Sequence, residues 1–359
     1  MNKYLFKNMN VFLISENMRG KHLLVLGYFG YRTGQLDGQT IKTRNVYELL
    51  NLNAHCSVDF FDTQEFKYSK LSPFLLLAKL FKCTKVFYLP AHNNLKYIFP
   101  LLFFLSYICR FSIVYIVIGG WLVDNLKNKW LHRLLLSHIC GILPENLLTI
   151  EELRMKYHFC NVYHLPNFRI HSFVPSVTPP KTSFRIVFMS RIMRMKGIDV
   201  VFSLAEYVKN NYLKETIEID FYGPIYKEDE TYFYRSVEEF DFVRYKGELL
   251  PCDINRTLHQ YDLLILPTRF YTEGFPGAIL DAYISHIPVL VSNWKYAHEY
   301  VDDGKTGFIC DLSDLSTFYH AVDYLYGNKD VLEQFKKNAK DKGEEYSSSR
   351  IWKKLEPFI

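Results

Sequence analysis

One stretch, residues 261–292, constrains the fold of this chain most. It opens with YDLLIL, a short apolar run that Pro267 ends, as is typical of a parallel strand covered on both faces. A loop with Glu273, Gly274 and Gly277 follows, then apolar residues at helical spacing and a second apolar run. The pattern predicts a strand, a loop, a helix that starts near Pro276, and a second strand of a parallel sheet.

The same alternation of strands and helices continues along the whole chain. At 359 residues the chain exceeds what one core usually fills, so we expect two domains, separated by the proline-rich stretch 165–181. The expected fold class is α/β, with two Rossmann-like, doubly wound parallel-sheet domains facing each other across a cleft. We expect these domains at residues 1–172 and 173–345, with a final helix at 346–359 that packs back on the first.

Individual boundaries follow from the apolar runs and the residues that stop them. We expect first-domain strands at residues 23–27, 57–61, 85–89, 113–118 and 139–143, and a helix at about 41–52. Second-domain strands are expected at residues 185–189, 217–222 and 242–245, besides the strand at 261–266. Thr149 and Glu152 have the spacing of a capping box, which predicts a helix that opens at Ile150.

Charge is unevenly distributed, although the net charge is only +5. Residues 66–140 contain ten Lys or Arg, all between 67 and 133, against one acid, Asp124. The segment is also rich in Leu and Phe, which favours contact with an anionic membrane surface over nucleic acid. The alternative is a core helix with a solvated basic face. Pro100 and Arg110 interrupt the apolar residues 97–118, so we predict no membrane span there.

Cysteine usage indicates the compartment. The seven cysteines are scattered and never form a C-x-x-C pair, which argues against a disulfide framework and against a zinc site. A reducing cytosol is therefore expected. The first 21 residues have too short and too broken an apolar run for a secretory signal.

Charged side chains cluster where strands of the second domain end. Arg191 and Lys196 follow one strand, and Glu273 and Asp281 follow another. Because parallel strands end at the same sheet edge, these loops converge where α/β folds bind ligands. Arg191 and Lys196 suit a diphosphate, and Glu273 and Asp281 can accept hydrogen bonds from sugar and ribose hydroxyls. Alternatively, Glu273 is a favourable acid at a helix start and the others are solvated.

Two glycine-bearing loops follow strands of the first domain. The glycines at 27, 30, 34 and 38 match neither G-x-G-x-x-G nor a P-loop, so a dinucleotide or NTPase site is weakly indicated. The first loop either closes over a substrate or serves turn formation and capping. Gly119-Gly120 allows close approach of the backbone to a ligand. The polar residues of the first loop are Arg32, Asp37, Gln39, Thr40 and Lys42.

Together these residues resemble the family 4 retaining glycosyltransferases of GT-B fold. The C-terminal half matches almost throughout, and the N-terminal half more loosely. The segments DGQTIKT, EGFPGAILDA and NWKYAHE resemble a bacterial surface-polysaccharide branch. The matching residues are Arg191, Lys196-Gly197, Glu273 to Pro276, Asp281, Pro288-Val289, Glu299, Asp303-Gly304 and Thr306 to Phe308.

The resemblance implies roles for both domains. The first would bind an acceptor and the second a nucleotide-sugar donor, which is a substrate and not a cofactor. It implies catalytic roles for Glu273, Arg191 and Lys196, and no metal, because the basic pair and a helix N-terminus would replace Mg²⁺. The implied donor-binding residues are Arg191, Lys196, Gly223, Glu273, Gly274, Phe275, Gly277, Asp281 and Gly34; those on the acceptor side are Arg32, Gln39, Lys42, Gly119 and Gly120.

This chain departs from the family pattern at four places. Asp281 stands where the family mostly has Glu, which shortens the reach to a ribose by one methylene. Pro276 replaces a glycine and removes an amide N–H. Ser190 replaces the usual Gly before Arg191. Gly119-Gly120 stands where many relatives carry a histidine near the reacting carbon, which argues against a histidine-based role here.

The expected function is transfer of a sugar from a nucleotide-sugar to a lipid-linked or oligosaccharide acceptor, with retention of configuration, in surface polysaccharide biosynthesis. The enzyme would be cytoplasmic and peripheral to the inner face of the plasma membrane, without a nucleic-acid partner. Two alternatives stay open at this point. One is a GT-B nucleotide-sugar 2-epimerase, and the other is a non-catalytic sugar-nucleotide binding subunit.

Overall fold

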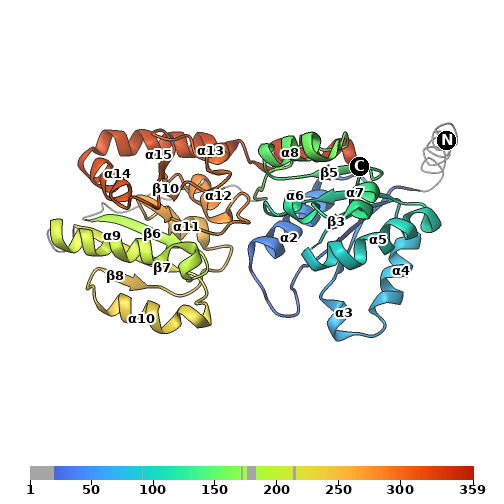
Figure 1. The fold of residues 1–359 in the computed structure, drawn as a ribbon, viewed down its shortest axis with the longest axis horizontal. Helices are drawn as coiled ribbons and strands as arrows, with labels where there is room; N and C mark the ends of the chain where they lie inside the picture. The colour runs from blue at the N-terminus through green and yellow to red at the C-terminus, as the bar shows by residue number, and fades with distance from the viewer. Residues whose placement is uncertain (1–19, 91, 171–172, 176–182, 213–215) are drawn as a thin grey trace. The chain divides into compact units, whose positions relative to one another are not determined.

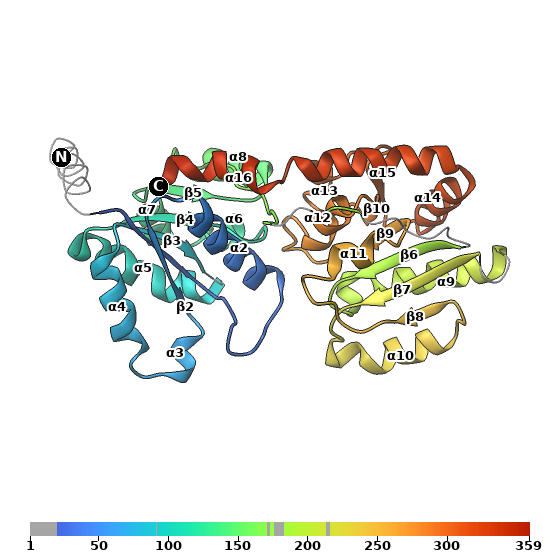
Figure 2. The ribbon, with the colours of Figure 1, turned by 180° about the vertical axis from the view of Figure 1, so that it is seen from behind.

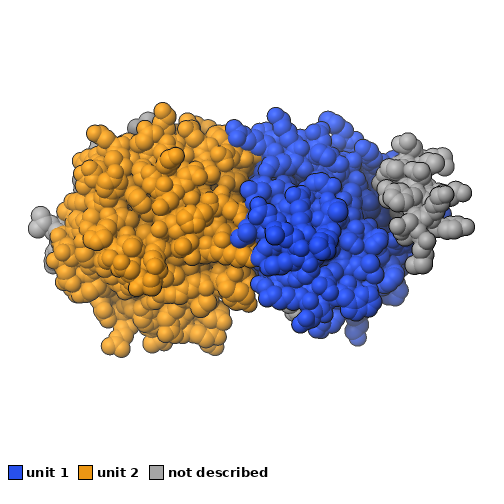
Figure 3. Space-filling model, turned by 45° about the horizontal axis from the view of Figure 1, so that its top comes forward, with its two compact units in different colours: residues 1–170, 348–359 blue, residues 171–347 orange. Residues whose placement is uncertain are grey.

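A computed structural model describes residues 20–90, 92–170, 173–175, 183–212 and 216–359. The chain divides into two compact units, coloured blue and orange in Figure 3. Unit 1 comprises residues 1–170 and 348–359, and unit 2 comprises residues 171–347. Each unit has its own parallel sheet with helices packed against it (Figures 1 and 2).

The sheet of unit 1 is parallel throughout, with the order β2-β1-β3-β4-β5 within the described residues. Alternate residues of β1 point to opposite faces: Leu24 and Leu26 join one apolar cluster, and Leu23 and Val25 the other. A buried parallel sheet needs this apolar character on both faces. The strands are β1 (His22–Gly27), β2 (Ser57–Asp62), β3 (Lys85–Leu89), β4 (Ser112–Ile116) and β5 (Gly141–Leu143).

Helices cover both faces of this sheet. Residues of α4, α5, α7 and α8 belong to one apolar cluster, whereas residues of α2 and α16 belong to the other. The helices are α2 (Gly38–Asn53), α3 (Glu65–Tyr68), α4 (Ser72–Lys82), α5 (His92–Cys109), α6 (Leu122–Asn125), α7 (Trp130–Leu136), α8 (Leu147–Tyr157) and α16 (Ser348–Leu355).

The last residues of the chain belong to unit 1 and complete its core. Ile351 and Leu355 of α16, and Phe358 of the 3₁₀ turn η3 (Glu356–Phe358), are buried in the cluster that contains Leu23 and Val25. The segment 348–359 therefore supplies part of one wall of the core of unit 1.

The sheet of unit 2 is also parallel throughout, with the order β11-β10-β9-β6-β7-β8 within the described residues. Its inner strands β6, β7, β9 and β10 are mostly buried, as covered parallel strands are, whereas the edge strands β8 and β11 are only partly buried. The prediction of two Rossmann-like, doubly wound domains is thus confirmed. The strands are β6 (Phe184–Met189), β7 (Ile217–Tyr222), β8 (Val243–Tyr245), β9 (Leu263–Leu266), β10 (Val289–Ser292) and β11 (Gly307–Cys310).

The helices of unit 2 alternate with these strands, and α14 and α15 follow the last one (Figure 1). They are η1 (Arg194–Lys196), α9 (Ile198–Asn211), η2 (Lys227–Asp229), α10 (Glu230–Glu238), α11 (Ile254–Leu258), α12 (Gly277–Ile284), α13 (Ala297–Tyr300), α14 (Ser316–Gly327) and α15 (Lys329–Glu344).

Two predicted helix starts were wrong. The helix α8 begins at Leu147 with Asn146 as its N-cap residue, so Thr149 lies inside the helix and is no cap. The helix α2 begins at Gly38, ahead of the predicted 41, because the Asp37 carboxylate accepts a hydrogen bond from the Thr40 amide and caps it.

Among the residues that the structure describes, no helix combines the length and the apolar character needed to cross a membrane. The prediction about a secretory signal concerns residues of which 1–19 lie outside the described part of the chain.

Candidate functional site

In unit 2, the loops that follow β6 and β9 meet at one edge of the sheet. The two strands are neighbours, but the chain continues from β6 to β7 on one side and from β9 to β10 on the other. Ligands of α/β sheets bind at such a reversal, outside the carboxyl ends of the strands. Arg191 and Lys196 lie in the first of these loops and Glu273 in the second.

Lys196 and Glu273 form an ion pair at this reversal. Lys196 Nζ donates to Glu273 Oε2, which also accepts a hydrogen bond from Thr268 Oγ1 at 3.3 Å. The lysine and glutamate side chains are 7% and 12% exposed, respectively. The ammonium and the carboxylate thus neutralise each other, and both groups are mostly buried but keep some contact with solvent. An anionic ligand can enter such a site by taking the place of Glu273 beside Lys196. A hydroxyl-bearing ligand can enter by taking the place of Lys196 beside Glu273.

The ring of Phe270 links both basic residues. Arg191 Cζ lies 5.5 Å and Lys196 Nζ lies 4.9 Å from the centroid of this ring. Attraction between a cation and an aromatic face holds both charged groups beside one ring. The expectation that the two cations converge agrees with this geometry. Phe270 is not among the site residues predicted from the sequence. The available signal was an aromatic residue close to the end of a predicted strand.

Side-chain contacts fix the loop after β6 from two directions. Arg194 donates from its backbone N and its Nε to the Asp229 carboxylate, at 2.8 and 2.6 Å. Arg269, in the loop after β9, donates from Nη1 to the carbonyl oxygen of Arg194 at 3.3 Å and to Asp199 Oδ1, at the start of α9, at 2.7 Å. Lys196 therefore projects from a turn that neighbouring loops hold in place.

Two glycines of this edge are required by backbone packing. Gly197 has φ of +87°, and a Cβ there would lie 2.1 Å from the carbonyl oxygen of Pro267. Gly223 has φ of +132°, and a Cβ there would lie 1.9 Å from the carbonyl oxygen of Ser190. Only glycine fits either position. The presence of Gly223 is thus explained by packing alone, and its donor-binding role stays a prediction.

The helix α12 starts at this same sheet edge, with Pro276 as N-cap residue and Gly277 as first helical residue. This agrees with the predicted start near Pro276. The Phe275 ring stacks on Tyr300, with centroids 4.0 Å apart and planes 3° apart. Because that ring is buried in the fold, only the backbone of Phe275 is suited to a ligand.

Asp281 lies one helical turn beyond Gly277 and is buried. Its backbone oxygen accepts hydrogen bonds from Ser285 Oγ at 2.7 Å and from Asn255 Nδ2 at 3.3 Å. The alternative of a solvated helix residue is therefore wrong. Gly274 is also buried, and its carbonyl accepts from Trp294 Nε1 at 3.4 Å.

In unit 1, a second ion pair lies where β4 and β5 end. Lys42 Nζ donates to Glu145 Oε1 at 2.6 Å, and these side chains are 0% and 4% exposed. Glu145 Oε2 accepts from the amide of Gly119 at 3.2 Å. Burial lowers the pKa of Lys42, and the Glu145 carboxylate opposes that shift. Lys42 was expected on the acceptor side, but its ammonium is enclosed and acts on the Gly119-Gly120 turn through Glu145.

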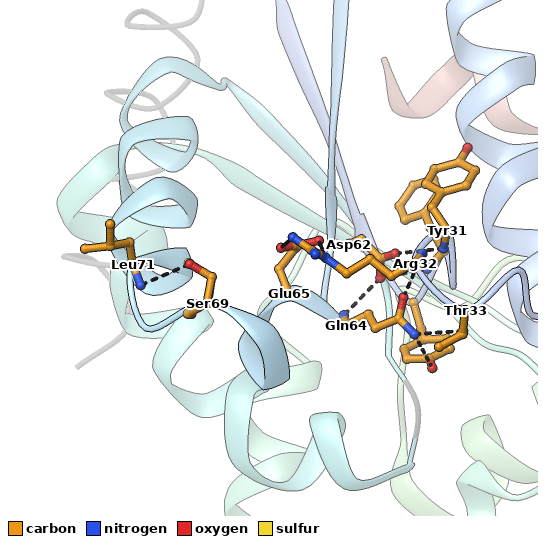
Figure 4. Close-up of polar contacts among 11 residues, drawn as sticks. Tyr31, Arg32, Thr33, Asp62, Gln64, Glu65, Ser69 and Leu71 are labelled. Atoms are coloured by element: carbon orange, nitrogen blue, oxygen red, sulfur yellow. Dashed lines mark hydrogen bonds and ion pairs between the residues drawn. The ribbon is translucent and has the colours of Figure 1, made fainter.

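The loop after β1 is held by the last residue of β2 and by residues that follow it (Figure 4). Asp62 accepts from the amides of Phe29 and Tyr31, at 3.1 and 3.3 Å. Arg32 makes a two-pronged ion pair with Glu65, at 2.6 and 2.9 Å. The Arg32 guanidinium is thus already engaged within unit 1 and stabilises this loop.

Two further residues of this region bear on a ligand. Gly34 has φ of +63°, a backbone conformation that favours glycine over other residues. A Cβ at this position would meet nothing within 4 Å. The side-chain nitrogen of Gln39 is buried and has no hydrogen-bond partner among the described residues. A buried amide donor without a partner is costly, so Gln39 is a candidate contact to a bound molecule.

No group of three or more His, Cys, Asp or Glu is arranged to hold a metal ion in the part of the chain that the structure describes. The absence of a metal requirement stays a prediction.

Comparison with known families identifies unit 2. Residues 172–342 match the family of glycosyl transferases group 1. The match covers slightly less than half of the chain and identifies a domain of this family in unit 2. The match confirms, at the level of the family, the resemblance to glycosyltransferases that was based on Arg191, Lys196, Glu273 and Asp281.

Two curated relatives of this glycosyl transferase domain are similar over part of the chain. The capsular polysaccharide biosynthesis glycosyltransferase CapM of Staphylococcus aureus is 24% identical over 176 residues, which is 48% of this chain and 45% of CapM. The UDP-Gal:alpha-D-GlcNAc-diphosphoundecaprenol alpha-1,3-galactosyltransferase of Escherichia coli is 33% identical over 90 residues, 25% of this chain and 22% of that enzyme. The chain thus spans less than half the length of these relatives.

Solved structures match both units. The structure of Anabaena HepE in complex with UDP aligns with a TM-score of 0.71 and 14% identity, and the alignment covers 94% of this chain and 99% of HepE. Sucrose-phosphate synthase from Thermosynechococcus elongatus aligns with a TM-score of 0.68 and 12% identity, over 94% of this chain and 98% of that one. The predicted GT-B fold is confirmed.

Proposed function

We propose that this chain is a retaining glycosyltransferase that moves a sugar from a nucleotide-sugar donor to a lipid-linked glycan acceptor in surface polysaccharide biosynthesis. The observation that carries the proposal is the Lys196–Glu273 ion pair at the reversal of the unit 2 sheet. It joins a cation suited to phosphate with a carboxylate suited to sugar hydroxyls, within a group 1 glycosyl transferase domain.

The relatives support the substrate classes. CapM is named for capsular polysaccharide biosynthesis, the E. coli enzyme for UDP-Gal and an undecaprenol diphosphate acceptor, and HepE was solved with UDP. A UDP-sugar donor and a polyprenol-linked acceptor are accordingly the first substrates to test.

In the proposed mechanism, donor binding rearranges the charges around Phe270. Lys196 exchanges Glu273 for the donor diphosphate, and Arg191 binds the same diphosphate from across the ring. Glu273 then accepts hydrogen bonds from hydroxyls of the donor sugar. Backbone amides at the start of α12 complete the anion site, and Asp281 binds the ribose.

Transfer with retention then occurs on one face of the sugar. The bond from the anomeric carbon to the leaving phosphate oxygen breaks, and a bond to the acceptor oxygen forms. The acceptor proton moves to the leaving diphosphate, whose charge Lys196 and Arg191 stabilise. No metal or cofactor takes part in this scheme. The acceptor approaches the Gly119-Gly120 turn, which Glu145 positions through the Gly119 amide.

We also infer a cytoplasmic location. All seven cysteines are free thiols. Burial raises the pKa of Cys83 and of Cys310 to about 12, which keeps both thiols protonated and unreactive at neutral pH. Free thiols of this kind are typical of a reducing compartment.

The test starts with donor binding. Thermal shifts with UDP-, GDP- and dTDP-sugars identify the nucleotide, because a ligand at 100 times its Kd stabilises a protein by about 2.7 kcal/mol. Transfer to a membrane extract is then measured for the wild type, Lys196→Ala and Glu273→Ala. We expect both variants to keep the fold and to lose transfer, whereas Lys227→Ala, an exposed lysine of η2, keeps it.

Other outcomes contradict the proposal in different ways. Near-normal transfer by both variants would refute the assigned site. Release of free nucleotide and sugar without acceptor would indicate a 2-epimerase. Donor binding without turnover on any extract would indicate a non-catalytic binding subunit.

A further inference from the structure

Three neighbouring helices of unit 1 expose large apolar side chains on their outer sides. The helix α5 packs against both α4 and α7, and the three lie next to one another in Figure 1. Their inner sides are buried against the sheet through residues such as Leu80, Phe99 and Leu136. We call the outer surface the α4–α5–α7 face; it comprises Phe74, Leu75, Phe81, Tyr97, Leu101, Phe104, Ile108, Trp130, Leu131 and Leu134.

The outer side of α5 is a continuous apolar stripe. Tyr97, Leu101, Phe104 and Ile108 follow one another at helical spacing and are 68%, 62%, 57% and 68% exposed. A solvated helix of a soluble domain carries polar residues there. Trp130 of α7 is 67% exposed beside this stripe. Since the inner sides already fill the core, the exposed side chains are not needed to bury the sheet.

The charges around this face are almost all positive. Lys70, Lys82, Lys96 and Arg110 are exposed next to its apolar residues in the sequence. The one acid of residues 66–140, Asp124, is paired with Lys127 at 2.9 Å. A second copy of the chain seated on this face would bring two positive rims together, which disfavours a dimer. An anionic lipid surface complements both the apolar residues and the charge.

We propose that the α4–α5–α7 face inserts into the surface of a membrane rich in anionic lipid. The aromatic and aliphatic side chains enter the boundary between headgroups and acyl chains, and Lys82, Lys96 and Arg110 contact lipid phosphates. The basic segment predicted from the sequence thus acts together with an apolar surface, which supplies the larger contact. This proposal is independent of sugar transfer, and its test uses no donor or acceptor.

The experiment is sedimentation of the full chain with vesicles of phosphatidylcholine alone or with about 30% phosphatidylglycerol. We expect binding to the anionic vesicles only. Leu101→Ser/Phe104→Ser should weaken the partition coefficient at least tenfold, and Lys82→Glu/Lys96→Glu likewise. The control Leu250→Ser/Tyr271→Ser, which removes two exposed apolar side chains of unit 2, should bind as the wild type does.

A second measurement reports insertion directly. Brominated lipids should quench the fluorescence of Trp130, and Trp130→Phe should remove that quenching while the far-UV spectrum stays unchanged. Equal binding by the stripe variant and the wild type would overturn the proposal, as would wild-type protein that ignores anionic vesicles. A wild-type dimer that the stripe variant converts to a monomer would show that the face binds a second copy instead.

Discussion

Two charged pairs lie at the carboxyl ends of the two sheets, and their burial separates their roles. The pair of Lys196 and Glu273 keeps some contact with solvent, whereas that of Lys42 and Glu145 has almost none. A ligand can compete for the first pair but not for the second. The first is suited to exchange with a substrate, and the second to hold a loop in position.

Phe270 tests the exchange at the first pair. Phe270→Leu should weaken donor binding about 5- to 30-fold, because both cations lose the aromatic face that orients them. Calorimetry with the nucleotide-sugar found by the thermal-shift screen measures this. The neighbouring Tyr271→Leu is the matched control, since Tyr271 is 82% exposed and should bind the donor as the wild type does. Equal donor affinities of the Phe270→Leu and Tyr271→Leu variants would show that Phe270 does not contribute to the donor site.

Lys42 tests the second pair. Lys42→Met should destabilise unit 1 by about 3–5 kcal/mol, because it removes the cation that forms the ion pair with the buried Glu145 carboxylate. Adding Glu145→Gln should restore at least half of the loss, since the amide still accepts from Gly119. Lys127→Met breaks the exposed pair with Asp124 and should cost below about 1 kcal/mol. Urea unfolding measures all three, and a Lys42 variant as mild as Lys127→Met would contradict the buried-charge argument.

The two pairs were predictable from the sequence to different degrees. Lys196 and Glu273 each follow an apolar strand, and strand ends of a parallel sheet share one edge, so their convergence could be expected. The partner of Lys42 could not, because Glu145 is 103 positions away. The burial of Lys42 did have a signal: it shares a helical face with Val46, Leu49 and Leu50, all fully buried.

At the scale of elements, α16 is connected to the loop after β5 through His164. His164 Nε2 lies 2.7 Å from the carbonyl oxygen of Glu145, and Lys354 Nζ lies 3.2 Å from its Nδ1. A neutral ring that donates from Nε2 and accepts at Nδ1 satisfies both contacts. Burial, and then the nearby Lys354 charge, lowers the pKa of His164 from about 6.5 to about 4.

This contact predicts acid sensitivity. Between about pH 6.5 and 4 the unfolded chain binds the proton and the folded chain does not, so stability falls as pH falls through this range. From about pH 7.5 to 5 the expected loss is on the order of 2 kcal/mol. Hydrogen exchange of peptides from β4 and α16 measures it. His164→Gln should lose less stability over that range, while the exposed His320→Gln should follow the wild type.

The residue at which a helix begins depends on contacts that one sequence pattern does not reveal. Thr149 and Glu152 have capping-box spacing, yet α8 starts earlier, at Leu147, and Thr149 is buried within it. In the sequence, α5 has the apolar composition of a helix that is buried in the core. Only the structure shows that one side of α5 is buried and that the other side, which is also apolar, is exposed to solvent. The strand assignments were more accurate, because each strand is a short apolar run stopped by a polar or glycine-bearing loop.

At the scale of the whole molecule, the chain enters unit 2 and then returns to unit 1. Deleting residues 348–359 should therefore destabilise unit 1, which loses Ile351, Leu355 and Phe358 from its core, and leave unit 2 protected. Hydrogen exchange of peptides from β1 and β9 compares the units within one sample. The double variant Arg350→Ala/Lys353→Ala changes only exposed positions of α16 and should leave both units as in the wild type. Equal loss of protection in β9 would contradict this division.

The return of the chain also sets an order of events during synthesis. Domains usually complete their folding in the order in which they leave the ribosome. Here the residues that close the core of unit 1, 348–359, are made after all of unit 2, residues 171–347. The unit whose translation begins first is thus the last whose residues are complete, and the core of unit 1 is not filled until α16 arrives.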